Sequence, residues 1–160
     1  MTQPETPVFT TTFRVRSYEL DALGHVNHAV YLNYLEQARF DALSAGGFPV
    51  SEMAARKWGV FVVRIEVDYR KECRQGELLT VRTRVDRFRN SSMIIGQVVE
   101  APDGETAVEA RVVAVWTGPD GRPMRIPPEV RDALSSTDPP DSSSSREPAT
   151  HPDESGPPPS

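Results

Sequence analysis

The feature that most constrains this chain is an alternation of apolar and polar residues that recurs in several segments around one helical stretch. In residues 8–18, for example, Phe9, Thr11 and Phe13 alternate with threonines and arginines. A period of two is typical of a strand with one buried face. Residues 93–99 are apolar at nearly every position, which is typical of a central strand. The other alternating segments are 61–70, 79–86 and 108–116.

The one long helical signal follows Asn27, a residue type that is common at helix N-caps. The apolar residues after it recur at intervals of three and four, which predicts a helix with one buried face. Gly46 and Gly47 end this pattern, and Pro49 prevents its return. Shorter helices are expected over residues 51–57 and 127–134.

The order of these elements is a strand, a long helix and four further strands. Short turns between the late strands predict an antiparallel meander, and the helix is expected to cover one face of the sheet. The chain is therefore predicted to be an α+β protein. The pattern alone does not separate the possible one-helix sheets from each other.

The composition changes sharply at residue 135, so we expect a folded domain over residues 1–134. Residues 135–160 contain no Val, Ile, Leu, Met or aromatic residue and are rich in Ser, Pro and acidic residues. Such a segment buries too little apolar surface to offset its ordering entropy, so it is predicted to be disordered. It holds five acidic residues and one arginine, which is −4 of the chain's net −5.

The folded part is consequently close to neutral, and this excludes a general basic field for nucleic acid or an anionic membrane surface. No apolar run approaches the roughly 18 residues that a membrane span requires. The N-terminus shows no signal-peptide pattern, so a cytoplasmic protein is the default expectation. Cys73 is the only cysteine, and an incidental free thiol is a simpler interpretation than a nucleophile.

Residues 17–39 contain a longer pattern: Tyr-x-x-Asp-x-x-Gly-His-Val-Asn, followed by Tyr31 and by Glu36-Gln37-Ala38-Arg39. This pattern resembles the signature of the 4-hydroxybenzoyl-CoA thioesterase family. The resemblance extends over about residues 8–126. It implies a hotdog fold, in which a curved five-stranded antiparallel sheet wraps around one long helix. It also implies an enzyme that hydrolyses an acyl-CoA or acyl carrier protein thioester.

Asp21 is the catalytic candidate, because its carboxylate is ionised at neutral pH and precedes the helix. It can attack the thioester carbon directly or act as a general base on water, and the residues leave both roles open. By resemblance, the backbone N–H of His28 would bind the thioester oxygen, where the positive end of the helix dipole also acts. Gly24, His25 and Asn27 complete the expected positioning loop. His25 is expected to order the loop or to contact the thioester in preference to acting as a direct base, and Asn27 is expected to be a helix cap.

Glu36 and the histidines are weaker candidates for a catalytic residue and for metal ligands. Glu36 is a catalytic residue in some hotdog enzymes, but its spacing to Arg39 also suits a structural ion pair. The histidines show no metal-ligand spacing, so no metal site is expected. No cofactor is expected either, because coenzyme A would be part of the substrate.

Coenzyme A carries phosphates, which arginine side chains bind well. The turn containing Arg87, Arg89, Ser91 and Ser92 is the first candidate, since relatives place basic residues near it. A second candidate is a set of basic residues that would otherwise be a polar sheet face: Arg64, Arg70, Lys71 and Arg74.

The resemblance further implies a homodimer or homotetramer, with sheets joined edge to edge and active sites at the subunit interface. A non-catalytic module that binds acyl thioesters is the alternative function. A binder has no need of Asp21, which favours the hydrolase. A hotdog dehydratase would need a different arrangement of His and Asp.

Overall fold

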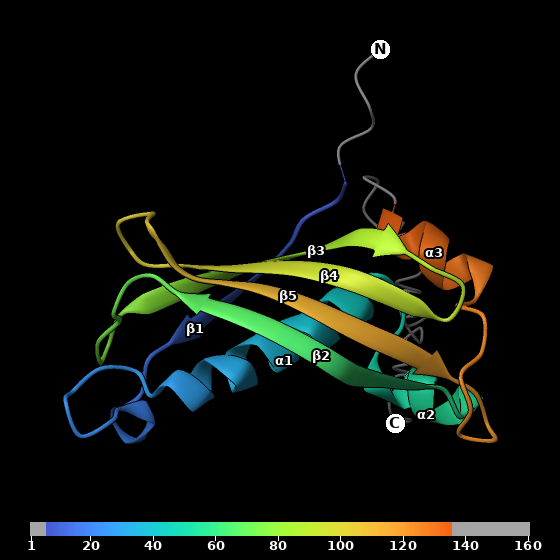
Figure 1. The fold of residues 1–160 in the computed structure, drawn as a ribbon, viewed down its shortest axis with the longest axis horizontal. Helices are drawn as coiled ribbons and strands as arrows, with labels where there is room; N and C mark the ends of the chain where they lie inside the picture. Colours follow the sequence, from blue (N-terminus) through green and yellow to red (C-terminus); the bar gives the residue numbers. More distant parts are fainter. Residues whose placement is uncertain (1–5, 136–160) are drawn as a thin grey trace, which may run out of the picture.

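The structure is a computed structural model, and it describes residues 6–135. Its elements follow the predicted order (Figure 1). The strands are β1 (Phe9–Arg14), β2 (Gly59–Tyr69), β3 (Leu78–Phe88), β4 (Ser92–Glu100) and β5 (Thr106–Thr117). The helices are η1 (Ser17–Glu19), α1 (His28–Ala45), α2 (Val50–Arg56) and α3 (Pro128–Ser135). Of the tail predicted from residue 135, only Ser135 is among the described residues, at the end of α3.

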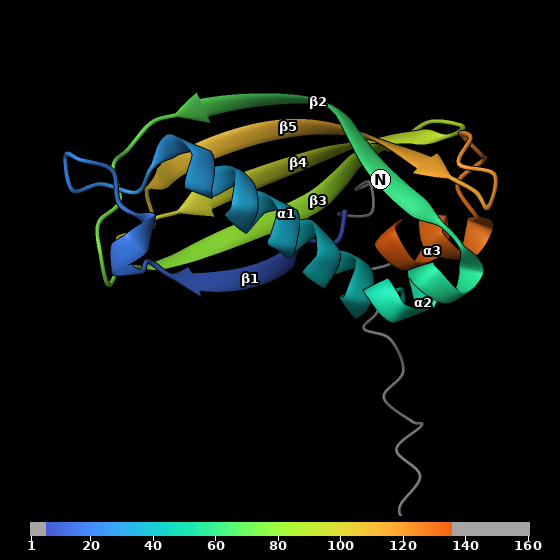
Figure 2. The same ribbon diagram turned by 90° about the horizontal axis from the view of Figure 1, so that it is seen from below.

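The five strands form one antiparallel sheet in the order β1-β3-β4-β5-β2. The sheet curves around α1, which runs along its concave side (Figure 2). Helices α2 and α3 lie together near the C-terminal end of α1. This is the expected α+β class with the hotdog arrangement, and the central position predicted for residues 93–99 is confirmed by β4.

The prediction of a four-strand meander is wrong for one strand. β3, β4 and β5 are consecutive neighbours, but β2 pairs with β5 and lies at the edge of the sheet. The connection from β2 to β3 therefore passes the ends of β5 and β4 at the end where β2 stops. This topology leaves β1 and β2 as the two edge strands.

The start of helix α1 is fixed by a side chain that accepts a hydrogen bond from a backbone N–H of the first turn. The Asn27 side chain accepts a hydrogen bond from the N–H of Ala29 at 2.9 Å, which confirms the predicted N-cap. At the other end the chain turns at Gly47, which has a φ of 94° that favours glycine. The buried face of α1 consists of Tyr31, Tyr34, Leu35, Ala38, Ala42 and Leu43.

A bulge in β2 divides its residues between the two faces of the sheet. The pairing with β5 shifts between Val62 and Arg64, so the alternation of β2 changes phase there. The sequence pattern groups Phe61 and Val63 with the inward Ile65. Instead, Phe61 is 59% exposed and Val63 is 62% exposed. The first half of this edge strand therefore presents an apolar surface.

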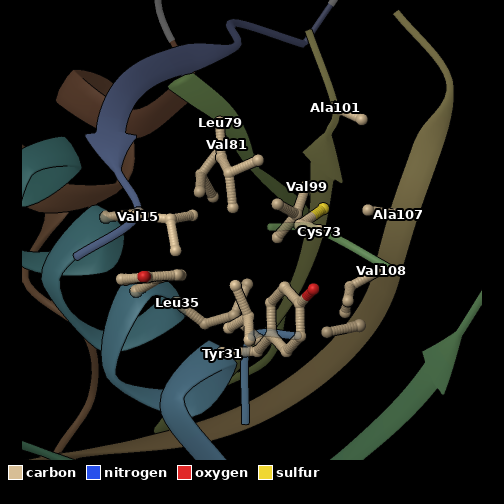
Figure 3. Close-up of a cluster of buried hydrophobic side chains, with 14 residues drawn as sticks. Val15, Tyr31, Leu35, Cys73, Leu79, Val81, Val99, Ala101, Ala107 and Val108 are labelled. Carbon is tan, nitrogen blue, oxygen red and sulfur yellow. The ribbon is translucent and has the colours of Figure 1, made fainter. Parts of the chain in front are cut away.

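The space between α1 and the sheet contains two groups of buried side chains. The group nearer the start of α1 is shown in Figure 3 and includes Tyr31, Leu35, Cys73, Val81 and Val108. It also includes Val26, the residue just before the N-cap. The second group lies under α2 and α3 around the fully buried Trp116. The first group packs against the loop that carries Asp21, because Val26 of this loop belongs to it.

Candidate active site

The loop from Leu20 to Asn27 is held in a compact form by its own backbone. The N–H of Asp21 donates to the carbonyl of His25 at 2.8 Å, and the N–H of Gly24 donates to the carbonyl of Asp21 at 3.1 Å. Gly24 has a φ of 85°, a conformation that glycine adopts without strain. Further bonds join the loop to the body, because the N–H of Val26 donates to the carbonyl of Cys73 at 2.9 Å.

The carboxylate of Asp21 lies inside this turn with its two oxygens in different surroundings. Oδ1 accepts hydrogen bonds from the N–H of Leu23 at 2.9 Å and from the N–H of His25 at 3.2 Å. Oδ2 lies 3.8 Å from Nδ1 of His25. No hydrogen bond to Oδ2 is found within residues 6–135. Since the side chain is 33% exposed, Oδ2 is the oxygen that a substrate can reach.

These contacts lower the pKa of Asp21. Partial desolvation acts to raise its pKa, but hydrogen bonds from the N–H groups of Leu23 and His25, together with the nearby imidazole, outweigh that effect. The pKa therefore lies below the ordinary value of 3.8. The carboxylate is ionised throughout the neutral range.

The first turn of α1 supplies a hydrogen-bond donor beside Asp21. The N–H of His28 has no hydrogen-bond acceptor within the described part of the chain, as is usual at a helix start. The carbonyl of the same residue accepts a hydrogen bond from the hydroxyl of Tyr69 at 2.9 Å. Tyr69, at the end of β2, thereby ties the first helical turn to the sheet.

Asp21, His25 and His28 line one open cavity of about 300 Å³. The predicted residues Asp21, His25 and His28 are thus brought together, and Gly24 and Asn27 shape the loop and the helix start. The cavity is completed by residues from the opposite side of the opening: Tyr69, Arg70, Lys71 and Glu72. An ionised carboxylate and a free helix N–H around one opening can attack a carbonyl carbon and stabilise its oxygen.

Sequence reasoning missed Tyr69 and Glu72. Both lie more than 40 residues after His28, at the end of β2 and in the connection that follows it. The only available signal was their place at the end of an alternating segment. This position in the sequence does not indicate that the two residues face the Asp21 loop. That depends on where the end of β2 lies relative to the start of α1.

Cys73 is fully buried behind this cavity, beside Tyr31 (Figure 3). Burial raises the pKa of the Cys73 thiol. A buried thiol that is largely protonated is a poor nucleophile. This location agrees with the interpretation of Cys73 as an incidental free thiol.

A second cavity, of about 340 Å³, lies between α1 and the sheet and has mostly apolar walls. Glu36 and Arg39 lie in its lining, and neither residue reaches the Asp21 cavity. The ion pair expected between them is not formed, because the guanidinium of Arg39 donates to the side-chain oxygen of Gln97 at 2.9 Å. The remaining lining residues include Leu32, Phe40, Val60, Phe61, Ile65 and Met93.

The four candidate residues for coenzyme A in the β3–β4 turn lie far from Asp21. Ser92 pairs with Val115 near the start of β2, whereas the Asp21 loop lies near Tyr69 at its end (Figure 1). The eleven residues of β3 separate the two regions by roughly 30 Å. The side chains of Arg87 and Arg89 are exposed. One chain therefore does not bring Arg87, Arg89, Ser91 and Ser92 to its own Asp21.

Among the second set of basic residues, Arg70 and Lys71 do line the Asp21 cavity. Each has an acidic partner, Glu109 at 2.9 Å from Arg70 and Glu105 at 2.7 Å from Lys71. Arg64 pairs with Glu66 at 2.6 Å, and Arg74 lies 3.5 Å from Glu72. Exposed pairs of this kind are weak and can be displaced by a phosphate.

Residues 6–135 contain no group of three or more His, Cys, Asp or Glu placed to hold a metal ion. None of the described helices is both long and apolar enough to cross a bilayer.

Both the sequence and the fold of this chain are similar to those of known proteins. Residues 15–134 match the family described as the thioesterase-like superfamily. Among curated proteins, the chain is similar to the long-chain acyl-CoA thioesterase FadM of Escherichia coli, with 34% identity over 66% of this chain and 80% of FadM. It is also 30% identical to the chloroplastic acyl-acyl carrier protein thioesterase ATL3 of Arabidopsis thaliana, over 74% of this chain. The chain spans only 63% of the length of ATL3.

Among solved structures, the chain resembles a thioesterase from Thermus thermophilus that was crystallised with coenzyme A and zinc. The TM-score is 0.71 and the sequence identity is 33%, over 81% of this chain and 92% of the other. The likeness therefore covers both the fold and the sequence of most of the described residues.

Proposed function

Since this chain belongs to the thioesterase-like superfamily, we propose that it hydrolyses an acyl-CoA thioester with Asp21 as the nucleophile. The observation that supports this most directly is the pair formed by Oδ2 of Asp21 and the free N–H of His28 around one opening. FadM and the coenzyme A-bound thioesterase from Thermus thermophilus support the choice of acyl-CoA as the substrate.

In the proposed reaction, Oδ2 of Asp21 attacks the thioester carbonyl carbon while the N–H of His28 hydrogen-bonds the carbonyl oxygen. The C–S bond breaks, and the thiolate leaves with a proton taken from solvent. Water then hydrolyses the acyl–Asp21 anhydride to the free acid. Both catalytic roles of Asp21, nucleophile and general base, need an ionised carboxylate, and the lowered pKa keeps it ionised at neutral pH.

The second cavity has mostly apolar walls, which would suit a largely hydrocarbon acyl group, but it shares no lining residue with the Asp21 cavity. Its volume of about 340 Å³ is at the lower end of the range for small-molecule sites. A carrier-protein thioester, as named for ATL3, is the second substrate class.

We also propose that two copies pair through β2. This edge strand exposes Phe61, Val62 and Val63, and an open apolar edge is a site for strand pairing. Two β2 strands that pair antiparallel around a twofold axis place the start of one beside the end of the other. The Arg87–Ser92 turn of one copy would then approach the Asp21 cavity of its partner. A cytoplasmic location, consistent with the free Cys73, completes the proposal.

The test is thiol release from a panel of aliphatic and aromatic acyl-CoAs, followed with a thiol-reactive dye. We expect Asp21→Asn to lower kcat by about 100-fold or more while the fold stays intact, because an amide cannot form the anhydride. The matched control is Asp41→Asn, which changes a half-buried carboxylate of α1 that accepts a hydrogen bond from the side chain of Gln37.

Equal activity in Asp21→Asn and in the wild type would contradict the assignment of the nucleophile. Binding of acyl-CoA without thiol release would show that the chain is a non-catalytic acyl-thioester module.

A further inference from the structure

Glu72 makes the second side-chain contact of the His25 ring. It lies in the connection between β2 and β3, and its Oε2 is 3.2 Å from Nε2 of His25. The other ring nitrogen, Nδ1, faces Oδ2 of Asp21 at 3.8 Å. The His25 side chain is 22% exposed, so the ring is held between two carboxylates at the rim of the cavity.

We infer that Glu72 is a positioning residue that acts on Asp21 through His25. An ionised carboxylate can only accept a hydrogen bond, and Oε2 of Glu72 at 3.2 Å is nearer to its ring nitrogen than Oδ2 of Asp21 at 3.8 Å, so the geometry favours the ring proton on Nε2. In the neutral ring, Nδ1 is then the unprotonated nitrogen, and it is the one that faces Asp21. Glu72 therefore selects both the orientation and the tautomer of the imidazole.

This assignment gives the ring a defined task, which rests on the proposed function. Unprotonated Nδ1 lies beside the oxygen that would carry the acyl group. In the second step it accepts a proton from water while the water oxygen attacks the acyl carbon. The bond between that carbon and Oδ2 breaks, which releases the free acid and restores the Asp21 carboxylate. The proton on Nδ1 then passes to solvent.

The other groups around His25 come from three segments. Arg74 is the bridge partner of His25 and lies 3.5 Å from Oε2 of Glu72, so it competes for the same carboxylate oxygen. Glu72 is 60% exposed, which limits the strength of its contact with the ring. The titratable groups that share the cavity are His28, Tyr31, Tyr69, Arg70 and Lys71.

The kinetic test is a double-mutant cycle on an acyl-CoA that the wild type hydrolyses. We expect Glu72→Gln to lower kcat by about 10-fold with KM unchanged within about twofold. We expect His25→Gln to lower kcat at least as much, and the double variant to be no slower than His25→Gln alone. Losses that multiply in the double variant would show that Glu72 does not act through His25.

Two further variants separate positioning from general charge. Glu72→Asp keeps a carboxylate and should recover part of the lost kcat. Glu105→Gln removes a neighbouring carboxylate that pairs with Lys71 and does not contact His25, and it should leave kcat unchanged. Equal losses in Glu105→Gln and Glu72→Gln would overturn the inference.

A third measurement does not depend on activity. In protein labelled with ring-¹⁵N histidine, the NMR spectrum of neutral His25 should show the proton on Nε2 in the wild type and a mixture of tautomers in Glu72→Gln. The same tautomer in both proteins would overturn the inference. A Glu72-dependent tautomer in a protein that releases no thiol would support the positioning role and contradict the proposed function instead.

Discussion

At the scale of single residues, the two oxygens of Asp21 have separate tasks. Oδ1 accepts two backbone N–H groups and closes the loop, whereas Oδ2 is left toward the cavity. A loop aspartate of this kind is common in turns, so the hydrogen bonds of Oδ1 alone would indicate only a structural role. What distinguishes this aspartate is that Oδ2 faces His25 and that the residue shares a cavity with His28 at the start of α1.

The lowered pKa of Asp21 leads to a prediction about stability. A carboxylate whose pKa is lower in the folded state stabilises that state above its ordinary value of 3.8, and the stabilisation is lost as the pH falls through the folded value. The difference in unfolding free energy between the wild type and Asp21→Asn should therefore be constant above about pH 5. It should shrink below pH 3.8.

Urea unfolding of both proteins from pH 7 down to pH 3 measures this difference. A difference that stays constant over the whole range would contradict the hydrogen bonds assigned to the carboxylate.

The candidate residues that are neighbours in the chain also lie together in the structure. Asp21, Gly24, His25, Asn27 and His28 lie within eight positions, so one loop and one helix start bring them together. Tyr69 contacts His28 from 41 residues away, and Glu72 contacts His25 over a similar separation. No local pattern encodes such contacts.

At the scale of elements, the start of α1 joins the fold to the proposed chemistry. The Asn27 cap fixes the residue at which helical geometry begins, and this residue sets the direction of the N–H of His28. The hydroxyl of Tyr69 holds the same turn from the sheet side. A shift of the helix start would therefore change both stability and the position of the donor.

We expect Asn27→Ala to lower the free energy of unfolding by about 1 kcal/mol, because the cap hydrogen bond to Ala29 is lost. Urea denaturation measures this change. Asn33→Ala is the control, since Asn33 is an exposed residue of the same helix and alanine is the better helix former. An equal loss in both variants would show that the cap contributes nothing.

Strand β2 shows where element prediction reached its limit. Its extent was predicted well, but its partner and the facing of Phe61 and Val63 were not. Strand pairing is decided by contacts with distant segments, and a single bulge reverses the alternation without leaving a sequence signal.

At the scale of the whole molecule, the Asp21 cavity and the coenzyme A candidates lie at opposite ends of the sheet (Figure 1). The exposed apolar edge of β2 runs between these ends. The proposed pairing of two copies through β2 would bring the two ends together, and it would also cover Phe61 and Val63. The proposed site is therefore complete only in the pair.

We expect Val63→Lys to weaken association strongly, because it puts a charge into the apolar edge that the pair buries. Sedimentation velocity should show a shift from dimer to monomer at micromolar concentration, and thiol release should fall in parallel. Thr12→Lys is the matched control, since Thr12 is an exposed residue of the other edge strand, β1. A shift caused by Thr12→Lys alone would place the interface at β1.

The sequence by itself determined the class of fold, the order of elements and the loop that carries Asp21. These properties depend on local periodicity, capping residues and turn residues. Such signals come from residues that are close together in the sequence. The tertiary structure alone decided that β2 is an edge strand, that Cys73 is buried, and that Glu72 meets His25. Each of these outcomes depends on which distant segments pack together. The set of contacts that gives the whole fold its lowest free energy decides this packing.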